Sequence, residues 1–323
     1  EYVVYDGVAQ QEIGIQNATT EMAEANFVAL KNQGVDFIKI YEMVSEDVFE
    51  TLVRLAGEHG LPIAAHVPLS LTASSAGPRV GSMEHLRNVE MDCAGNATEL
   101  QETRLALLEN ADGVDGSTLR FSMHTLQRLP AITVEDSSRC DRVLASLTST
   151  IQVPTARLNA LDILLPMDRL DWDAAVARLP DTVPEPWLSV PYWIAEDPEE
   201  RDTRYAEWSL AMIGRMNAAG VPVGAGTDTP IGTAIPGYSL HNELDMLVRA
   251  GLTPLEALRA ATVTPAEFFS LDDQMGTIEV GMRADLVLLD ADPMLDIHNT
   301  RTVNTVISRG LIVRSAADPS TNQ

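Results

Sequence analysis

The sequence predicts an α/β fold built on a parallel sheet, followed by a small C-terminal β appendage. A strand, a helix and a second strand follow one another within residues 37–67, a helix and a strand return at 205–225, and closely spaced strands take over at 275–323. Short apolar strands separated by helices are typical of parallel sheets that helices cover. The length of 323 residues fits about two domains of ~150 residues, or one α/β barrel with an appendage.

The first elements follow from capping residues and apolar patterns. One helix is predicted from a cap at Thr19 or Thr20 to Gly34 and another from a cap at Ser45 to Gly60, because a hydroxyl side chain can cap each start and a glycine can end each helix. Residues 37–41 and 63–67 are short and apolar, which is typical of buried strands. Together they predict a βαβ unit.

The same alternation returns at residues 205–219, a predicted helix, and at 221–225, a predicted strand. The region before it is predicted to be less regular, with a proline-rich acidic surface loop at 180–202. Two later helices are predicted to begin at Thr253 and Thr264, each an N-cap followed by a proline at the first helical position. Three strands joined by turns complete the chain at 284–290, 303–308 and 311–313.

Composition limits the partners that the chain can have. The net charge is −25 and 45% of the residues are hydrophobic, so the sequence predicts a folded globular chain without the basic surface that binds nucleic acid or anionic membranes. No apolar run approaches the ~18 residues of a membrane helix. No signal peptide can be read at the N-terminal end. We therefore expect neither a nucleic-acid nor a membrane partner.

The chain has two cysteines, Cys93 and Cys140. They cannot form a zinc site alone, because a CxxC-type spacing is absent. Their number fits one disulfide in an oxidising compartment or two buried thiols in the cytoplasm. We predict the disulfide, and with it a periplasmic or secreted location rather than a cytoplasmic one.

Four residues are predicted at the carboxyl ends of parallel strands, where α/β barrels build their active sites. Lys39 lies inside an apolar strand, and a desolvated amine can form a Schiff base or a carbamate that binds metals. His66 ends the next strand, His85 precedes a predicted helix, and Asp228 follows the strand at 221–225. Each also has a structural interpretation, as an ion-paired lysine, a hydrogen-bonded histidine or a helix-capping aspartate. Imidazole with carboxylate suits zinc or a similar divalent ion.

Several motifs, weak one by one, together resemble a known family. They are Gly34–Val67, Glu84-His85, Gly224–Asp228, Leu240–Leu244 followed by Ala250–Pro254, and Gly281–Val287. In this order and spacing they resemble the metal-dependent amidohydrolase superfamily, and within it the imidazolonepropionase-like and Xaa-Pro dipeptidase-like branch. The likeness covers most of the chain and is weakest from about residue 90 to 202.

The resemblance implies a (β/α)8 TIM-type barrel over residues 1–274, with a long insertion at about 90–202, and the C-terminal part of a composite β-sandwich over 275–323. It implies that Lys39, carbamylated by CO2, bridges two divalent ions, expected to be zinc. His66, His85 and Asp228 match further metal ligands. Asp228 also matches the catalytic residue that shuttles the proton of the attacking water. Tyr41 and His241 are expected to contact substrate.

The chain departs from the family in one respect, since the His-x-His pair of the first barrel strand is missing. We expect that the chain lacks an N-terminal portion and binds metal weakly; a genuine short paralogue is the alternative. The remaining histidines are predicted to be structural at a helix end (His59) or on the surface (His124 and His298).

The predicted function is hydrolysis of amide or peptide-like C–N bonds, in an N-acyl amino acid, a dipeptide or a cyclic amide, by a metal-activated hydroxide. A mononuclear deaminase or cyclic-amidine hydrolase is one alternative, and a non-catalytic or fragment barrel without the first-strand ligands is another. The expected partners are a small-molecule substrate and a second copy of the chain in a homo-oligomer.

Overall fold

A computed structural model of the chain describes residues 2–4, 14–110, 114, 116–164, 175–177, 179, 201–229, 231 and 234–315. The chain divides into two compact units. Unit 1 comprises Glu1–Pro154 and Met216–Val223, and unit 2 comprises Thr155–Arg215 and Gly224–Gln323. Each unit has its own sheet or helix cluster and is described by itself.

The elements of unit 1 are β1 (Tyr2–Val4), β2 (Gly14–Gln16), α1 (Thr20–Gln33), β3 (Ile38–Ile40), α2 (Glu46–His59), β4 (Ile63–Ala65), α3 (Ala73–Ala76), the 3-10 helix η1 (Gly77–Arg79), β5 (Ser82–Glu84), α4 (Val89–Asp92), α5 (Ala97–Glu109), α6 (Gly116–Thr133), α7 (Ser137–Ser146) and β6 (Ile151–Val153). Those that follow are α8 (Ala156–Asn159), α9 (Leu161–Leu164), α12 (Arg204–Ala218), α13 (Ser239–Arg249), α14 (Pro254–Ala260), α15 (Val263–Phe268), β7 (Leu286–Leu289), the 3-10 helix η4 (Ile297–Arg301), β8 (Val303–Ser308) and β9 (Leu311–Ser315).

A four-stranded parallel sheet in the order β3-β4-β5-β6 forms the centre of unit 1. The side chains of Ile38, Ile40 and all of β4 are buried, as expected of strands with helices nearby. The predicted strand at 221–225 is reduced to one parallel bridge, between Val223 and Gln152 of β6. Pro222 has no N–H to donate to a ladder, which limits the pairing there.

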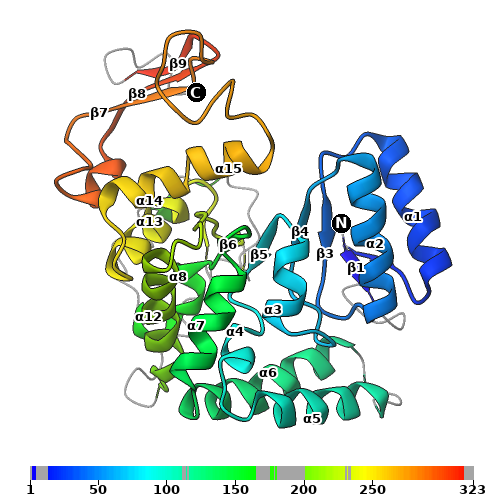
Figure 1. The fold of residues 1–323 in the computed structure, drawn as a ribbon. Helices are drawn as coiled ribbons and strands as arrows, with labels where there is room; N and C mark the ends of the chain where they lie inside the picture. The colour runs from blue at the N-terminus through cyan, green and yellow to red at the C-terminus, as the bar shows by residue number, and fades with distance from the viewer. Residues whose placement is uncertain are drawn as a thin grey trace. The chain divides into compact units, whose positions relative to one another are not determined.

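The first two helices begin and end where their capping residues predict. The Thr19 side chain accepts a hydrogen bond from the N–H of residue 22 at the start of α1, and the Ser45 side chain does the same for residue 48 in α2. Both helices end at a left-handed glycine, Gly34 or Gly60, with φ of 78° and 65°. Figure 1 shows α2 beside β3 and α1 outside α2. The βαβ prediction is confirmed.

Residues 90–164 are mainly helical, so the prediction of a less regular segment is wrong here. The buried faces of α5 and α6 carry Arg104, His124 and Gln127, and these polar side chains hide the apolar period that would have indicated helices. The predicted disulfide is confirmed, since Cys93 and Cys140 are bonded with their Cα atoms 4.3 Å apart. Most of the predicted surface loop at 180–202 lies outside the described residues.

In unit 2, α14 begins after Thr253 in a capping box with Glu256, as predicted. Helix α15 begins at Val263, so the prediction that it begins after Thr264 is wrong. Pro265 lies in its first turn, where a backbone N–H has no partner within the helix and its loss costs little. The three strands predicted at the C-terminal end are β7, β8 and β9, and the structure pairs them in an antiparallel sheet.

The motif from residue 240 to 244 has a structural role in unit 2. Glu243 of α13 is fully buried, and its two carboxylate oxygens accept hydrogen bonds from the backbone N–H groups of Ala156 and Arg157, each at 2.8 Å. A carboxylate at this place satisfies N–H groups that the first turn of α8 leaves without partners.

These findings confirm an α/β fold with a parallel sheet and a C-terminal antiparallel sheet. The closure of eight strands into a barrel and the composite sandwich remain predictions. Within the ranges that the structure describes, no helix is long and apolar enough to cross a membrane.

Candidate metal centre

Three side chains of unit 1 gather at the carboxyl ends of β4 and β5. His66 follows β4, Glu84 ends β5, and His85 follows Glu84. One donor atom from each residue lies within 4.8 Å of the other two. Oε2 of Glu84 is 3.5 Å from Nε2 of His66 and 3.8 Å from Nε2 of His85. The three donors therefore converge on one point, which chain neighbours alone would not produce.

The ammonium group of Lys39 lies next to the point where the three donor atoms converge. Lys39 is the middle residue of β3, paired in register with Ala64 of β4. Its Nζ forms an ion pair with Oε2 of Glu84, the oxygen that both histidines face. The side chains of Lys39 and Glu84 are 18% and 20% exposed, so the ion pair is largely shielded from water. The donor set is therefore arranged to accept a positive charge.

His85 is held by an unusual backbone turn. His85, Leu86 and Asn88 all have left-handed conformations, with φ of 59°, 56° and 63°. Such conformations are uncommon outside glycine and persist where the surroundings enforce them. The Asn88 amide donates to two backbone carbonyls of the segment after β4, at 3.0 and 2.9 Å, and its oxygen accepts from Arg104 at 2.6 Å. These bonds fix the turn that carries His85.

Both imidazoles are kept neutral by burial. Desolvation lowers the pKa of His66 to about 3, although the carboxylate of Glu42 opposes this shift. Desolvation also lowers the pKa of His85 well below its ordinary value, and the charges on Arg87 and Lys39 add to the effect. A neutral imidazole has a free lone pair on one nitrogen, which is the form that binds metals.

The residues present fit a divalent cation. Two imidazole nitrogens and one carboxylate oxygen are a donor set that zinc commonly accepts, and three protein ligands leave room for water or substrate. Glu84 belongs to the Glu84-His85 motif, but no role was predicted for it. The signal was its position immediately before His85, at the end of a strand.

The structure brings together Lys39, His66 and His85 among the predicted site residues. Tyr41 is buried beside them, with its ring centroid 4.4 Å from that of His66. Asp228 belongs to unit 2, where it is exposed and has a left-handed backbone with φ of 53°. The assignment of these residues as ligands and substrate contacts stays a prediction.

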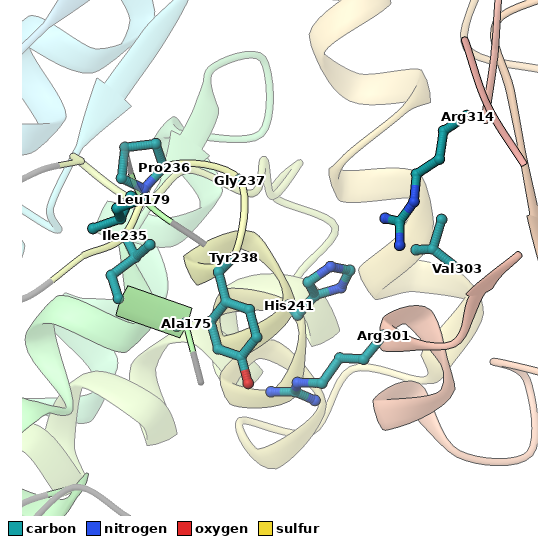
Figure 2. Close-up of a pocket in the computed structure, with 10 residues that line it drawn as sticks. All are labelled: Ala175, Leu179, Ile235, Pro236, Gly237, Tyr238, His241, Arg301, Val303 and Arg314. Atoms are coloured by element: carbon teal, nitrogen blue, oxygen red, sulfur yellow. The ribbon is translucent and has the colours of Figure 1, made fainter. Parts of the chain in front are cut away.

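His241, the other predicted substrate contact, lines a pocket of about 270 Å³ within unit 2. Its Nδ1 is 2.9 Å from the hydroxyl oxygen of Thr300. Figure 2 shows the His241 ring between Arg314 on one side and the Tyr238 and Arg301 side chains on the other. The lining residues are Ala175, Leu179, Ile235, Pro236, Gly237, Tyr238, His241, Arg301, Val303 and Arg314. The pocket combines apolar walls with cationic and aromatic groups.

The predictions for the remaining histidines have different outcomes. His59 is the last residue of α2, and His298 is exposed over 57% of its side chain, both as predicted. The surface prediction for His124 is wrong, because its side chain is buried and contacts the carboxylate of Glu42. Helix α6, which carries it, was not predicted, so no sequence pattern indicated that this residue is buried.

Glu90, a second buried carboxylate of unit 1, gives a testable pH dependence. Burial raises its pKa to about 7 from 4.5, although Arg104 opposes the shift. Between these values the folded chain keeps a proton that the unfolded chain releases, so the free energy of unfolding falls as pH rises. In Glu90→Gln this fall should be smaller by about 2 kcal/mol between pH 5 and pH 8. Urea denaturation of both chains at the two pH values measures it, and parallel pH profiles would contradict it.

Part of the chain matches a family model. Residues 201–313 match the model described as the amidohydrolase family. Imidazolonepropionase from Brevibacillus brevis is 33% identical over 103 residues, which are 31% of this chain and 24% of that protein. Adenine deaminase from Ligilactobacillus salivarius is 33% identical over 86 residues, 27% of this chain and 15% of that protein. N-substituted formamide deformylase from Arthrobacter pascens is 36% identical over 93 residues, which are 26% of this chain and 17% of that protein.

Solved structures resemble most of the chain in fold. Bottromycin amidohydrolase aligns with a TM-score of 0.65 and 21% identity, covering 97% of this chain and 63% of its own. A Xaa-Pro dipeptidase with bound methionine in its active site aligns with a TM-score of 0.56 and 17% identity. This alignment covers 92% of the present chain and 59% of the dipeptidase chain. The matched segments span about a quarter or less of the curated relatives, and the chain spans about three fifths of these structures. The resemblance predicted from the motifs is confirmed.

Proposed function

We infer that this chain belongs to the amidohydrolase family, and we propose from this premise that it acts as a metal-dependent hydrolase of C–N bonds in a small molecule. The observation that carries the proposal is the convergence of His66, Glu84 and His85 on one point that Lys39 also reaches. The names of the relatives and the fold of the structural neighbours support the same class of reaction.

Each site residue has a proposed role. His66 and His85 would hold a divalent cation through Nε2, with Glu84, Asp228 and a carbamylated Lys39 as further ligands for a pair of zinc ions. When bound, such a cation supplies Lewis acidity toward the scissile carbonyl and lowers the pKa of water. Asp228 takes the proton from the attacking water and returns it to the leaving amine.

The proposed substrates are N-acyl amino acids, dipeptides and cyclic amides. Tyr41 is placed to contact substrate near His66, because their rings are packed together. His241 is a second proposed contact, since it lines a pocket whose guanidinium groups suit a carboxylate. A His241→Ala chain should then have a raised KM for an N-acyl amino acid with little change in kcat.

The proposal is tested first by zinc binding. The chain is stripped with a chelator and titrated with Zn²⁺ by calorimetry. In His85→Gln the zinc affinity should fall by more than ~100-fold, since even residues that only support a ligand cost about 10–100-fold when changed. His298→Gln is the matched control, because His298 is exposed and distant in sequence. Absence of zinc binding, or equal affinity in His85→Gln and the parent chain, would overturn the metal centre.

The lysine carbamate is tested by the stoichiometry of zinc. With bicarbonate present, the parent chain should bind two zinc ions, whereas Lys39→Met should bind one at most, because methionine cannot form the carbamate that would supply oxygen ligands. Amine release from a panel of N-acyl amino acids and dipeptides then measures hydrolysis. A stoichiometry that bicarbonate leaves unchanged would contradict the carbamate.

A mononuclear deaminase or cyclic-amidine hydrolase is the second candidate. The match to a protein named adenine deaminase favours it, because that name denotes a deaminase, and the match to imidazolonepropionase is to a protein that is not named as a peptidase. It predicts one zinc ion per chain, no effect of bicarbonate, and ammonia release or ring opening in place of amide hydrolysis. A chain that binds no metal and turns over none of these substrates would be the non-catalytic barrel.

A further inference from the structure

Glu42 is a buried carboxylate that no role proposed so far uses. Its side chain is fully buried, just beyond β3 and three residues after Lys39. One oxygen, Oε1, is 2.9 Å from Nδ1 of His66 and 2.9 Å from Nε of Arg87. The other oxygen, Oε2, is hydrogen-bonded to Nε2 of His124. Glu42 thus connects the candidate metal centre to helix α6.

The surroundings of Glu42 fix the direction of its bond to His66. Arg87 lies at ion-pair distance, and Nη1 of Arg120 is 3.5 Å from Oε1, so the carboxylate is ionised. An ionised carboxylate can only accept hydrogen bonds. Nδ1 of His66 is therefore the donor, and the lone pair of this neutral ring is on Nε2, the atom that faces Glu84.

His124 fixes Glu42 in turn. It is buried at 5% exposure, and its Nε2 bonds to the carboxylate oxygen that His66 does not use. The Tyr41 ring packs on His66, and the Arg120 guanidinium lies over Tyr41 at 5.0 Å from the ring centroid. His66 is thus held by a hydrogen bond on one edge and an aromatic ring on one face. A ring held in this way cannot turn its donor atom away from the site without breaking a buried hydrogen bond.

We propose that Glu42, held by His124, is a positioning residue that fixes the tautomer and orientation of His66, with Nδ1–H on the carboxylate and Nε2 toward the metal centre. A carboxylate on the far nitrogen also raises the basicity of a metal-binding imidazole. The part of this inference that concerns metal affinity rests on the proposed function, whereas the tautomer does not.

The first test needs no metal. Long-range ¹H–¹⁵N spectra of the chelator-treated chain at pH 7 report which nitrogen of each imidazole carries the proton. A signal from a ring protonated at Nδ1 should disappear in His66→Gln, which separates it from other rings whose Nδ1 faces an acceptor, such as His298 beside Asp296. In Glu42→Gln the amide has one acceptor oxygen against four donors, so the His66 signal should be lost or divided between two tautomers. A parent chain with His66 protonated at Nε2 would overturn the proposal, whatever the variants do.

The second test measures zinc affinity by competition with a chelator. Glu42→Gln should bind Zn²⁺ about 10–100-fold more weakly than the parent chain. Glu90→Gln is the matched control, because Glu90 is also a buried carboxylate of unit 1 but pairs with Arg128, at 3.5 Å. Its zinc affinity should stay within about twofold of the parent value.

Other outcomes separate this inference from the proposed function. If the parent chain binds no zinc, the proposed function fails. The spectra that report the tautomer of His66 then decide by themselves whether Glu42 positions this ring. If Glu42→Gln does not fold, His124→Gln replaces it and should shift the His66 signal in the same direction. A folded Glu42→Gln chain with the parent tautomer and parent zinc affinity would overturn the positioning role.

Discussion

The Arg104→Ala chain is expected to be about 3–5 kcal/mol less stable to unfolding than the parent chain. Arg104 is fully buried in α5. Its Nε donates to Oε1 of Gln127 at 2.7 Å, and its Nη1 donates to Oδ1 of Asn88 at 2.6 Å. Removal of the guanidinium leaves the two buried acceptor oxygens without their donor, and a buried polar group without a partner carries the full cost of desolvation. It also removes a cation near the buried Glu90, which keeps its ion pair with Arg128.

Urea denaturation at pH 7 measures this loss. Arg54→Ala is the control, since Arg54 is half exposed and pairs with Glu24 and Glu58 on the surface. Exposed pairs contribute about 0–1 kcal/mol. A loss below about 1 kcal/mol in Arg104→Ala would show that the buried network contributes little. Because Arg104 also holds Asn88, the variant should bind Zn²⁺ more weakly than Arg54→Ala does.

Removal of the disulfide should have an effect of similar size. Cys93 and Cys140 close a loop with a sequence separation of 47, and loop-closure entropy predicts a loss of about 4 kcal/mol when the bond is opened. Both residues are fully buried, so alanine is the substitution that adds no polar group. The double Cys→Ala chain and the parent chain in reductant should unfold at the same lower urea concentration. A parent chain whose midpoint does not change on reduction would contradict the prediction.

Local signals explain the parts of the fold that were predictable. Helices α1 and α2 follow from a hydroxyl N-cap and a terminal glycine, and β3 and β4 follow from short apolar runs between them. The convergence of His66 and His85 was predictable for the same reason, because both follow parallel strands that are neighbours in the sheet. These features depend on residues close together in sequence.

The unpredicted parts depend on contacts between distant residues. Glu42 and His124 are 82 positions apart, and nothing near either residue indicates that they meet. Helices α5 and α6 bury arginine, histidine and glutamine in a polar network, so their buried faces lack the apolar repeat that indicates a helix. The role of Glu84 was missed for a different reason, since an acidic residue at a strand end is more often exposed.

The single bridge between Gln152 and Val223 has a consequence for work with fragments. Backbone N–H of Gln152 donates to the carbonyl of Pro222 at 2.8 Å, so the segment 216–223 covers the outer edge of β6. A fragment that stops at residue 154 would leave this edge open, and an unprotected strand edge can pair with other chains. Recombinant N-terminal fragments should therefore aggregate unless residues 216–223 are joined back to them through a linker.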